Sequence, residues 1–352
     1  MLSNTHSLED TWLGTRPTAE NTSDPEATQP GTSYKRDTEL WFEDGNLVLV
    51  AEDVEFKLYR GPLIAHSLVF KDMLSLPQPA DRDESCPVIP LYDSPNDLRH
   101  VLRVFVPGST LRSVHSESSH SAGHFEPSYE EVSACIRMGH KYQIEDLVQH
   151  NLAYLRKLYP SDFDAYLNAR RNRPPTFTPA HAIGVVNLAR LTGTDALLPA
   201  ALMECCTLSG IGIINGLERA DGTRETLSPE DLGRCFVGRT RMAQASARIA
   251  HQMFRQSIAK GCRHPACCVR VLQRLLNELG DGRIELLSSL DWFAPWTGYV
   301  DDKDEDRELC TPCYKMLSEE RPRQLQREVW TVLPAMMGVS IEAWGEKTNV
   351  EG

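Results

Sequence analysis

The chain lacks any apolar run that approaches the roughly 18 residues needed to cross a lipid bilayer. The nearest candidate, residues 196–216, contains Pro199, Glu204 and several glycines near its end, which favours a soluble helix followed by a loop. The first ten residues have neither a basic start nor an apolar core, so no secretory signal is indicated. These absences favour an intracellular protein, cytoplasmic or nuclear, over the membrane and secreted classes.

Positive charge is also in short supply. The 352 residues include 37 basic and 49 acidic side chains, for a formal net charge of −12, so bulk charge disfavours polyanion binding. Basic residues between 234 and 274 are expected to be dispersed over helices as a solvated surface, with only Phe236 and Phe254 among them. We therefore do not expect nucleic-acid binding.

Motifs that identify common enzymes are missing as well. The chain has no Gly-x-Ser-x-Gly, Walker, dinucleotide-binding or His-Glu-x-x-His motif. The glycine-rich stretch 210–216 does not follow a predicted strand, so we expect a flexible interhelical loop there. His115, His120 and His124 lie in a serine-rich insert and are expected to be exposed rather than to bind metal. We therefore expect a non-enzymatic protein with no catalytic or cofactor-binding residues.

The length allows two domains with some sequence left over. A composition of 41% hydrophobic and 24% charged residues is ordinary for a globular chain. Strand patterns are confined to the first half, which predicts an α+β fold whose C-terminal region is mostly α-helical. The predicted divisions are a disordered tail at 1–38, a first domain at 39–158 with a polar insert at 109–127, a linker at 159–176, a helical domain at 177–345 and a tail at 346–352.

The first domain should begin with a β-hairpin, because the apolar run 47–50 is followed by the alternating pattern 54–58. A single helix that opens at Gly61-Pro62 and stops before Pro77 should follow. Residues 88–91 predict a third strand. Ser94-Pro95-Asn96-Asp97 then has the pattern of a helix start with a serine cap.

Further helix starts are predicted in the second half of the chain and at the end of the first domain. Ser128 opens a capping box before two helices that break near residues 139–143. Other starts are at Thr178-Pro179 and Ser228-Pro229, and further amphipathic segments are at 239–258, 266–279 and 323–336.

Several stretches of the first domain resemble the BTB (POZ) interaction domain. They are Gly45-Asn46-Leu47-Val48-Leu49, Val54–Leu58, Tyr59-Arg60-Gly61-Pro62-Leu63, Ser67–Leu74, Val88–Asp93 and Leu98–Gly108. Residues 41–46 and 75–79 look most similar to the BTB proteins of mushroom-forming fungi. The resemblance covers residues 38–158 and continues more weakly into the helical region.

The resemblance implies protein–protein interaction, by self-association as a homo-oligomer or by recruitment of a partner, with the helical region as a second binding surface. A cullin-type ubiquitin ligase adaptor is an alternative, but the apolar-x-Glu motif of such adaptors has no match at 81–85. A transcriptional regulator is another alternative, which the acidity of the chain disfavours. The chain also departs from the family at Gly45-Asn46, Tyr59 and residues 106–108, so details of binding are not carried over.

Ten cysteines without an export signal are expected to be reduced and mostly buried. One group departs from that expectation, because Cys310-x-x-Cys313 has the spacing of a zinc knuckle. Its partners would come from Cys262 with Cys267, Cys268 or His264, and we predict Cys262, Cys267, Cys310 and Cys313 as the ligands of a structural zinc ion. The alternatives are cysteines that only pack at two helix starts, or neighbouring thiols without a metal.

Overall fold

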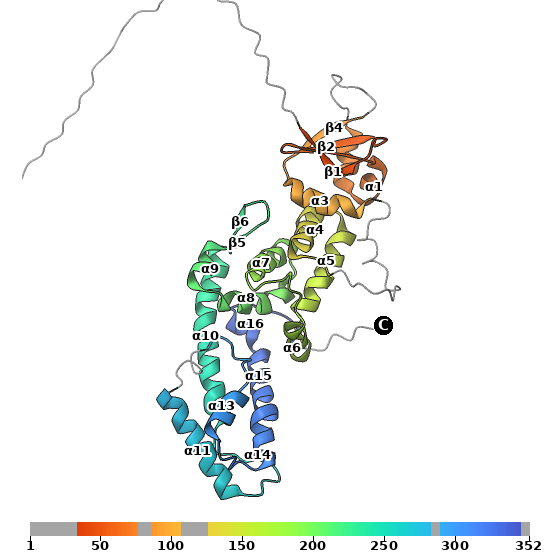
Figure 1. The fold of residues 1–352 in the computed structure, drawn as a ribbon. Helices are drawn as coiled ribbons and strands as arrows, with labels where there is room; N and C mark the ends of the chain where they lie inside the picture. The colour runs from red at the N-terminus through yellow and green to blue at the C-terminus, as the bar shows by residue number, and fades with distance from the viewer. Residues whose placement is uncertain (1–33, 77–85, 107–125, 283–288, 346–352) are drawn as a thin grey trace, which may run out of the picture.

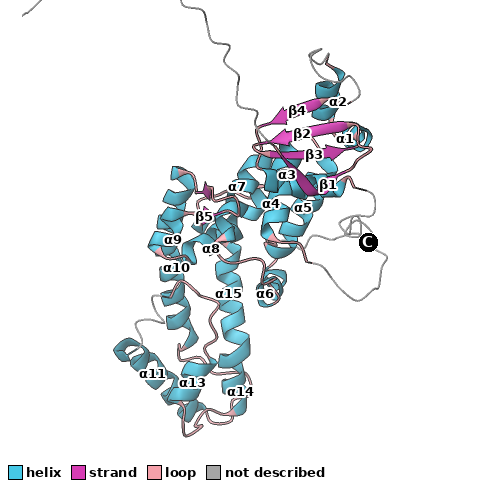
Figure 2. Cartoon of the chain, turned by 45° about the horizontal axis from the view of Figure 1, so that its top comes forward, coloured by secondary structure: helices cyan, strands magenta, loops and turns pink. Residues whose placement is uncertain are grey.

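The structure is a computed structural model, and it describes residues 34–76, 86–106, 126–282 and 289–345. It confirms a mixed α+β protein with a small N-terminal sheet and a helical C-terminal region. Figures 1 and 2 place the sheet at one end of the molecule and helices α11 and α14 at the other. Most of the insert predicted at 109–127, with its three histidines, lies outside the described residues.

The sheet contains β1 (Lys35–Trp41), β2 (Leu47–Ala51), β3 (Val54–Leu58) and β4 (Val88–Leu91), in the order β1-β3-β2-β4. Strands β2 and β3 form the predicted hairpin, and β4, the predicted third strand, runs parallel to β2. Strand β1 pairs in parallel with β3 and was not predicted. The tail predicted at 1–38 is therefore too long.

Strand β1 escaped prediction because its sequence is almost wholly polar. It buries only Leu40 and Asp37. The Asp37 carboxylate accepts hydrogen bonds from the backbone N–H groups of Glu39 and Leu40 and pairs with Arg99 at 2.7 Å. A buried charge that is paired in this way is tolerated where an unpaired one would not be. A polar edge strand of this kind has no alternating apolar pattern to detect.

Three helices pack against the sheet: α1 (Arg60–His66), α2 (Leu68–Ser75) and α3 (Pro95–Val104). The single helix predicted after Gly61-Pro62 is two helices, because Ser67 is extended at φ −128° and ψ 119°. Its hydroxyl oxygen accepts from the Phe70 N–H at 3.1 Å and caps α2, while the hydroxyl donates to the Tyr142 carbonyl at 2.6 Å. The break thus fixes the start of α2 to the C-terminal end of α4.

The remaining elements are mostly helical. They are α4 (Tyr129–Lys141), α5 (Glu145–Leu158), α6 (Phe163–Arg171), α7 (His181–Thr192), η2 (Asp195–Leu197), α8 (Leu198–Thr207), α9 (Gly210–Asn215), β5 (Leu217–Glu218), β6 (Arg224–Glu225), α10 (Pro229–Met253), α11 (Pro265–Gly282), α13 (Thr297–Lys303), α14 (Thr311–Lys315), η3 (Met316–Glu320), α15 (Arg321–Thr331) and α16 (Leu333–Met336). The capping serines predicted at 128 and 228 accept from Glu131 N–H and Asp231 N–H.

Two segments predicted to be irregular are helical. Residues 210–216, expected as a flexible loop, form α9, which Ser209 caps by accepting from the Gly212 N–H at 2.9 Å. The predicted linker 159–176 contains α6, whose Phe163 and Tyr166 are buried in the main helical core. The sequence of α6 favours a helix, because Ala165, Leu167 and Ala169 are good helix formers and the prolines that indicated a linker follow it at 174 and 175.

Helices α4 and α5 contribute to both hydrophobic cores of the molecule. On the side of the sheet, their buried residues include Ile144 and Leu147. On the side of the helical region, their buried residues include Tyr129 and Val132. The two domains predicted on either side of residue 158 therefore share these helices.

A buried ionic network joins the two halves at a second place. The Asp97 carboxylate at the start of α3 pairs with Arg137 of α4 at 3.1 Å and with Arg219 at 2.6 Å. Arg219 follows β5 in the short hairpin of the helical region, and it also pairs with Asp221 at 3.4 Å. Removing one partner would leave a desolvated charge, so the network fixes the hairpin against α3.

Within the described ranges, no helix combines the length and the apolar character that crossing a lipid bilayer requires.

Two serines at helix starts give a matched test of the packing on the sheet. Ser67→Ala removes a cap and leaves the Tyr142 carbonyl unpaired, so we expect a loss of about 2 kcal/mol in the free energy of unfolding. Ser94, predicted as the cap of α3, makes no cap hydrogen bond, and its buried hydroxyl has no partner among the described residues. Ser94→Ala should therefore change the free energy of unfolding by less than about 0.5 kcal/mol. Urea unfolding followed by circular dichroism measures both, and equal losses would contradict the assignment.

Candidate metal centre

Four cysteines from three separate segments meet at the end of the molecule farthest from the sheet. Cys262 lies in the loop between α10 and α11, and Cys268 lies in the first turn of α11. Cys310 is the N-terminal cap residue of α14, and Cys313 lies within that helix. Pro265 and Pro312 fix both helix starts, since proline is preorganised for the first helical turn. We call these residues the four-cysteine cluster.

The sulfur positions match the geometry of a tetrahedral metal site. All four Sγ atoms lie within 4.8 Å of one another. The Cys268–Cys310 and Cys310–Cys262 Sγ separations are 3.6 and 3.7 Å. A zinc–sulfur bond of about 2.3 Å gives a tetrahedron whose edges are about 3.8 Å. A disulfide needs about 2.05 Å, and all ten cysteines are free thiols.

The ligand set differs from the prediction at one residue, because Cys268 takes the place expected for Cys267. Successive helical residues point about 100° apart, so only one of the two can face the cluster. The Cys267 thiol instead donates to the Glu308 carbonyl, with 3.7 Å between the two atoms. His264, an alternative ligand, is exposed. Cys262, Cys310 and Cys313 lie together as predicted.

The correct cysteine carries a signal in the sequence that the prediction did not use. Cys268 shares the buried face of α11 with Leu272, Leu275 and Leu279, at helical spacings of four, seven and eleven residues. Cys267 does not belong to that series. Helical phase therefore distinguishes the two, whereas cysteine spacing alone does not.

Backbone and thiol donors surround the cluster. The Ala259 N–H donates to the Cys313 sulfur, and the Cys310 N–H donates to the Cys268 sulfur, both at 3.5 Å. Burial raises the pKa of Cys268 to about 11 and that of Cys313 to about 12. Burial also acts to raise the pKa of Cys310, but the backbone N–H groups of Arg263 and Cys313 and two neighbouring thiols outweigh it and hold that pKa at about 6. Metal binding requires the thiolate form, and these contacts favour that form at Cys310.

The cluster is closed in the manner of a structural site. Cys268 and Cys313 are fully buried in the main core, and Cys262 and Cys310 pack against it. Four protein sulfurs fill a tetrahedral shell, so no position remains for water or substrate. The arrangement can hold a soft divalent cation and link three segments, but it offers no open position for catalysis.

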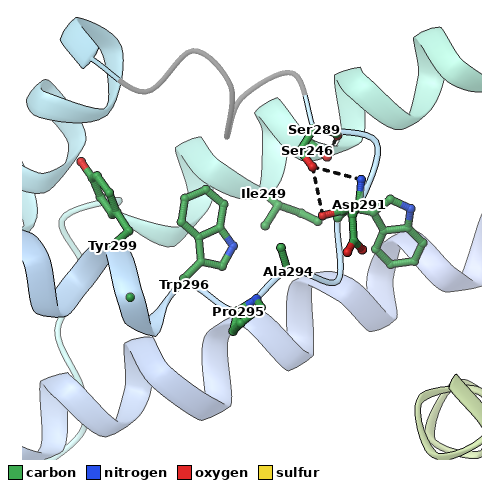
Figure 3. Close-up of a pocket in the computed structure, with 10 residues that line it drawn as sticks. Ser246, Ile249, Ser289, Asp291, Ala294, Pro295, Trp296 and Tyr299 are labelled. Carbon is green, nitrogen blue, oxygen red and sulfur yellow. Dashed lines mark hydrogen bonds between the residues drawn. The ribbon is translucent and has the colours of Figure 1, made fainter. Parts of the chain in front are cut away.

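A small cavity lies beside α10 (Figure 3). It measures about 130 Å³, and Ile249, Ala294 and Trp296 supply much of its apolar lining. The Ser246 hydroxyl donates to the Ser289 carbonyl at 2.5 Å, and Asp291 pairs with Arg170. Among the described residues that line it, Asp291 carries the one carboxylate, and that carboxylate is engaged in the ion pair with Arg170 at 2.7 Å.

Comparisons of the chain with family models, with curated proteins and with solved structures each give no match. A function for the chain is therefore inferred from its fold and from the four-cysteine cluster.

Proposed function

We propose that the chain is a non-enzymatic protein–protein interaction protein. Its N-terminal unit would mediate self-association or partner recruitment, and its helical region would provide a second binding surface. The observation that carries the proposal is the order of a hairpin, a helical segment, a strand, a helix and a helical pair (β2-β3, α1-α2, β4, α3, α4-α5), which agrees with the BTB resemblance of residues 38–158 except that the first helical segment is two helices. The four-cysteine cluster, which leaves no open ligand position, agrees with a structural rather than a catalytic role for those residues.

Self-association through the N-terminal unit is expected to use helix and loop surfaces rather than strand addition. Edge strand β4 contains Pro90, which has no N–H to donate to an added strand. Edge strand β1 exposes Lys35, Arg36 and Glu39, and such charges discourage edge pairing. Apolar exposure is instead found at Leu68 of α2, which is 60% exposed, and at Tyr92 after β4, which is 98% exposed.

Sedimentation velocity of the full chain tests this function. We expect an oligomer at tens of micromolar, and a shift to monomer in the double variant Leu68→Glu with Tyr92→Glu, because burying a carboxylate in an interface is unfavourable. Ile211→Glu is the control, since Ile211 is 74% exposed on α9, in the helical region, and its replacement should leave the oligomer intact. A wild-type chain that stays monomeric at high micromolar concentration would contradict self-association, and a failure to recover any partner by pull-down as well would contradict the proposal.

We further propose that the four-cysteine cluster holds one structural zinc ion. The sulfur separations suit its bond lengths, and four thiol ligands are a common structural zinc set. The ion would tie the loop after α10 and the start of α11 to the start of α14, which lies more than forty residues further along the chain. Metal binding to the folded chain alone would stabilise this end by mass action.

Adjacent cysteines provide a matched pair for the zinc proposal. Reduced wild-type protein should contain close to one zinc ion per chain and should melt at a lower temperature after chelation. Cys268→Ser should lose the metal, whereas Cys267→Ser should retain it, because Cys267 lies outside the cluster. Elemental analysis with thermal melting measures both. A metal content near zero in the reduced wild type, or equal content in the two variants, would refute the site.

A further inference from the structure

An open groove runs beside the four-cysteine cluster, with a volume of about 1080 Å³. Its walls come from the end of α10 and the loop after it, from α14 and η3, and from α15. Figures 1 and 2 place α14 at the end of the molecule away from the sheet, with α15 running from it toward the middle. Ala259 and Arg263 lie on one wall and Thr311 and Pro312 on another, next to the cysteines in sequence. The cluster thus holds the loop after α10 and the start of α14, which both border the groove.

The groove concentrates positive charge in a chain that is acidic overall. Five cations line it against two acids, Glu320 and Glu328, while the whole chain has a net charge of −12. The cations are Arg255, Lys260, Arg263, Lys315 and Arg321, and within the described residues none of them forms a salt bridge. All except Arg321 are exposed. We call this feature the basic groove.

Other basic residues of the region bind helix-end carbonyls or carboxylates, which, among the described residues, the four exposed cations of the basic groove do not. Arg239 and Arg241 donate to carbonyl groups at the ends of α8 and α16, which satisfies helix C-termini. Arg270 and Arg274 both pair with Glu308. The sequence predicted that all of these cations would be dispersed, and this is wrong for Arg255, Lys260 and Arg263, which gather on the basic groove. Folding brings Lys315 and Arg321 to the same place from a distant part of the chain.

Arg321 is a partly buried cation that contacts backbone carbonyls and lies near a second cation, Arg255. Its guanidinium donates to the Met253 and Ser257 carbonyls, each at 2.5 Å, and meets no carboxylate among the described residues. The pKa of Arg321 is below its usual value, first because of burial and then because of the nearby Arg255 guanidinium. The side chain is held in place by backbone dipoles while its charge stays uncompensated.

We propose that the basic groove binds an acidic polypeptide segment of a partner protein. Carboxylates would lie against the exposed cations, and an apolar side chain of the segment would meet Ile258, Met316 and Leu325 on the groove lining. The proposal rests on the interaction function proposed above and names the chemistry of the partner. The described lining residues include no aromatic ring on which bases could stack, which favours peptide over single-stranded nucleic acid.

Charge compensation of the metal centre does not account for all of the cations. A zinc ion with four thiolates carries two negative charges, and Glu320 and Glu328 add two more, so the five cations of the basic groove still exceed the negative charges by one. The ammonium and guanidinium groups of the four exposed residues are also accessible to solvent and to a ligand.

Fluorescence anisotropy with the full chain tests the proposal. The probe is a labelled 16-residue peptide of Glu-Glu-Leu-Asp repeats, and its counterpart carries Gln and Asn in place of Glu and Asp. We expect the acidic peptide to bind, to bind at least ten-fold more weakly at 300 mM than at 50 mM salt because screening weakens exposed charge pairs, and its counterpart not to bind. Absence of binding by the acidic peptide at 50 mM salt would overturn the proposal.

Two triple variants with the same change in net charge separate the groove from general electrostatics. Arg255→Glu with Lys260→Glu and Lys315→Glu should weaken peptide binding at least ten-fold. Lys71→Glu with Arg156→Glu and Lys157→Glu, all at exposed positions elsewhere, should weaken it less than two-fold. Equal weakening in both would overturn the proposal. The single variant Lys260→Glu, which should weaken binding measurably with unchanged melting, applies if the groove triple variant does not fold.

Three further readouts keep the interpretation specific. Zinc content should be unchanged in Lys260→Glu, and a loss of metal there would assign the cations to the metal centre and overturn the proposal. A 16-nucleotide single strand that binds more tightly than the peptide and is lost in the same variant would make this a nucleic-acid surface, which also overturns it. The oligomeric state is measured separately, so an intact oligomer without peptide binding rejects only the groove.

Discussion

The packing of α4 and α5 between two cores is the constraint on which the rest of the architecture depends. A sheet of four short strands with three helices has too little apolar surface to close its own core, and residues such as Ile144 and Leu147 complete it. The opposite faces of the same helices, with Tyr129 and Val132, begin the larger core. The chain therefore cannot be divided at residue 158 without exposing an apolar face, and the Asp97 network reinforces the same junction.

The two ends of the molecule are stabilised by different means. The sheet end depends on ordinary burial, on the capping hydroxyl of Ser67 and on paired charges such as Asp37 with Arg99. At the far end, the four-cysteine cluster joins segments that are distant in sequence. According to the two proposals, a metal ion would fix the loop after α10 and the start of α14, which border the basic groove. Metal binding and partner binding would then be coupled through this shared backbone.

Much of the fold could be predicted from the sequence where the pattern is local. The hairpin, β4 and the serine-capped starts of α4 and α10 follow from alternation and capping residues. Strand β1 and the break at Ser67 could not, because a buried ion pair and a hydrogen bond to a carbonyl 75 residues away decide them. Three of the four clustered cysteines were predicted, and helical phase, which spacing ignores, decides between Cys267 and Cys268.

Pro90 also bears on aggregation of the chain while it is being synthesised. During synthesis the strands emerge before α4 and α5, so the sheet exists for a time without the helices that complete its core. An incomplete sheet with an open edge can pair with another chain and aggregate. A proline in β4 and charged side chains on β1 make both edges poor templates. The same residues that disfavour association through the strands therefore also disfavour aggregation of the nascent chain until α4 and α5 have been synthesised.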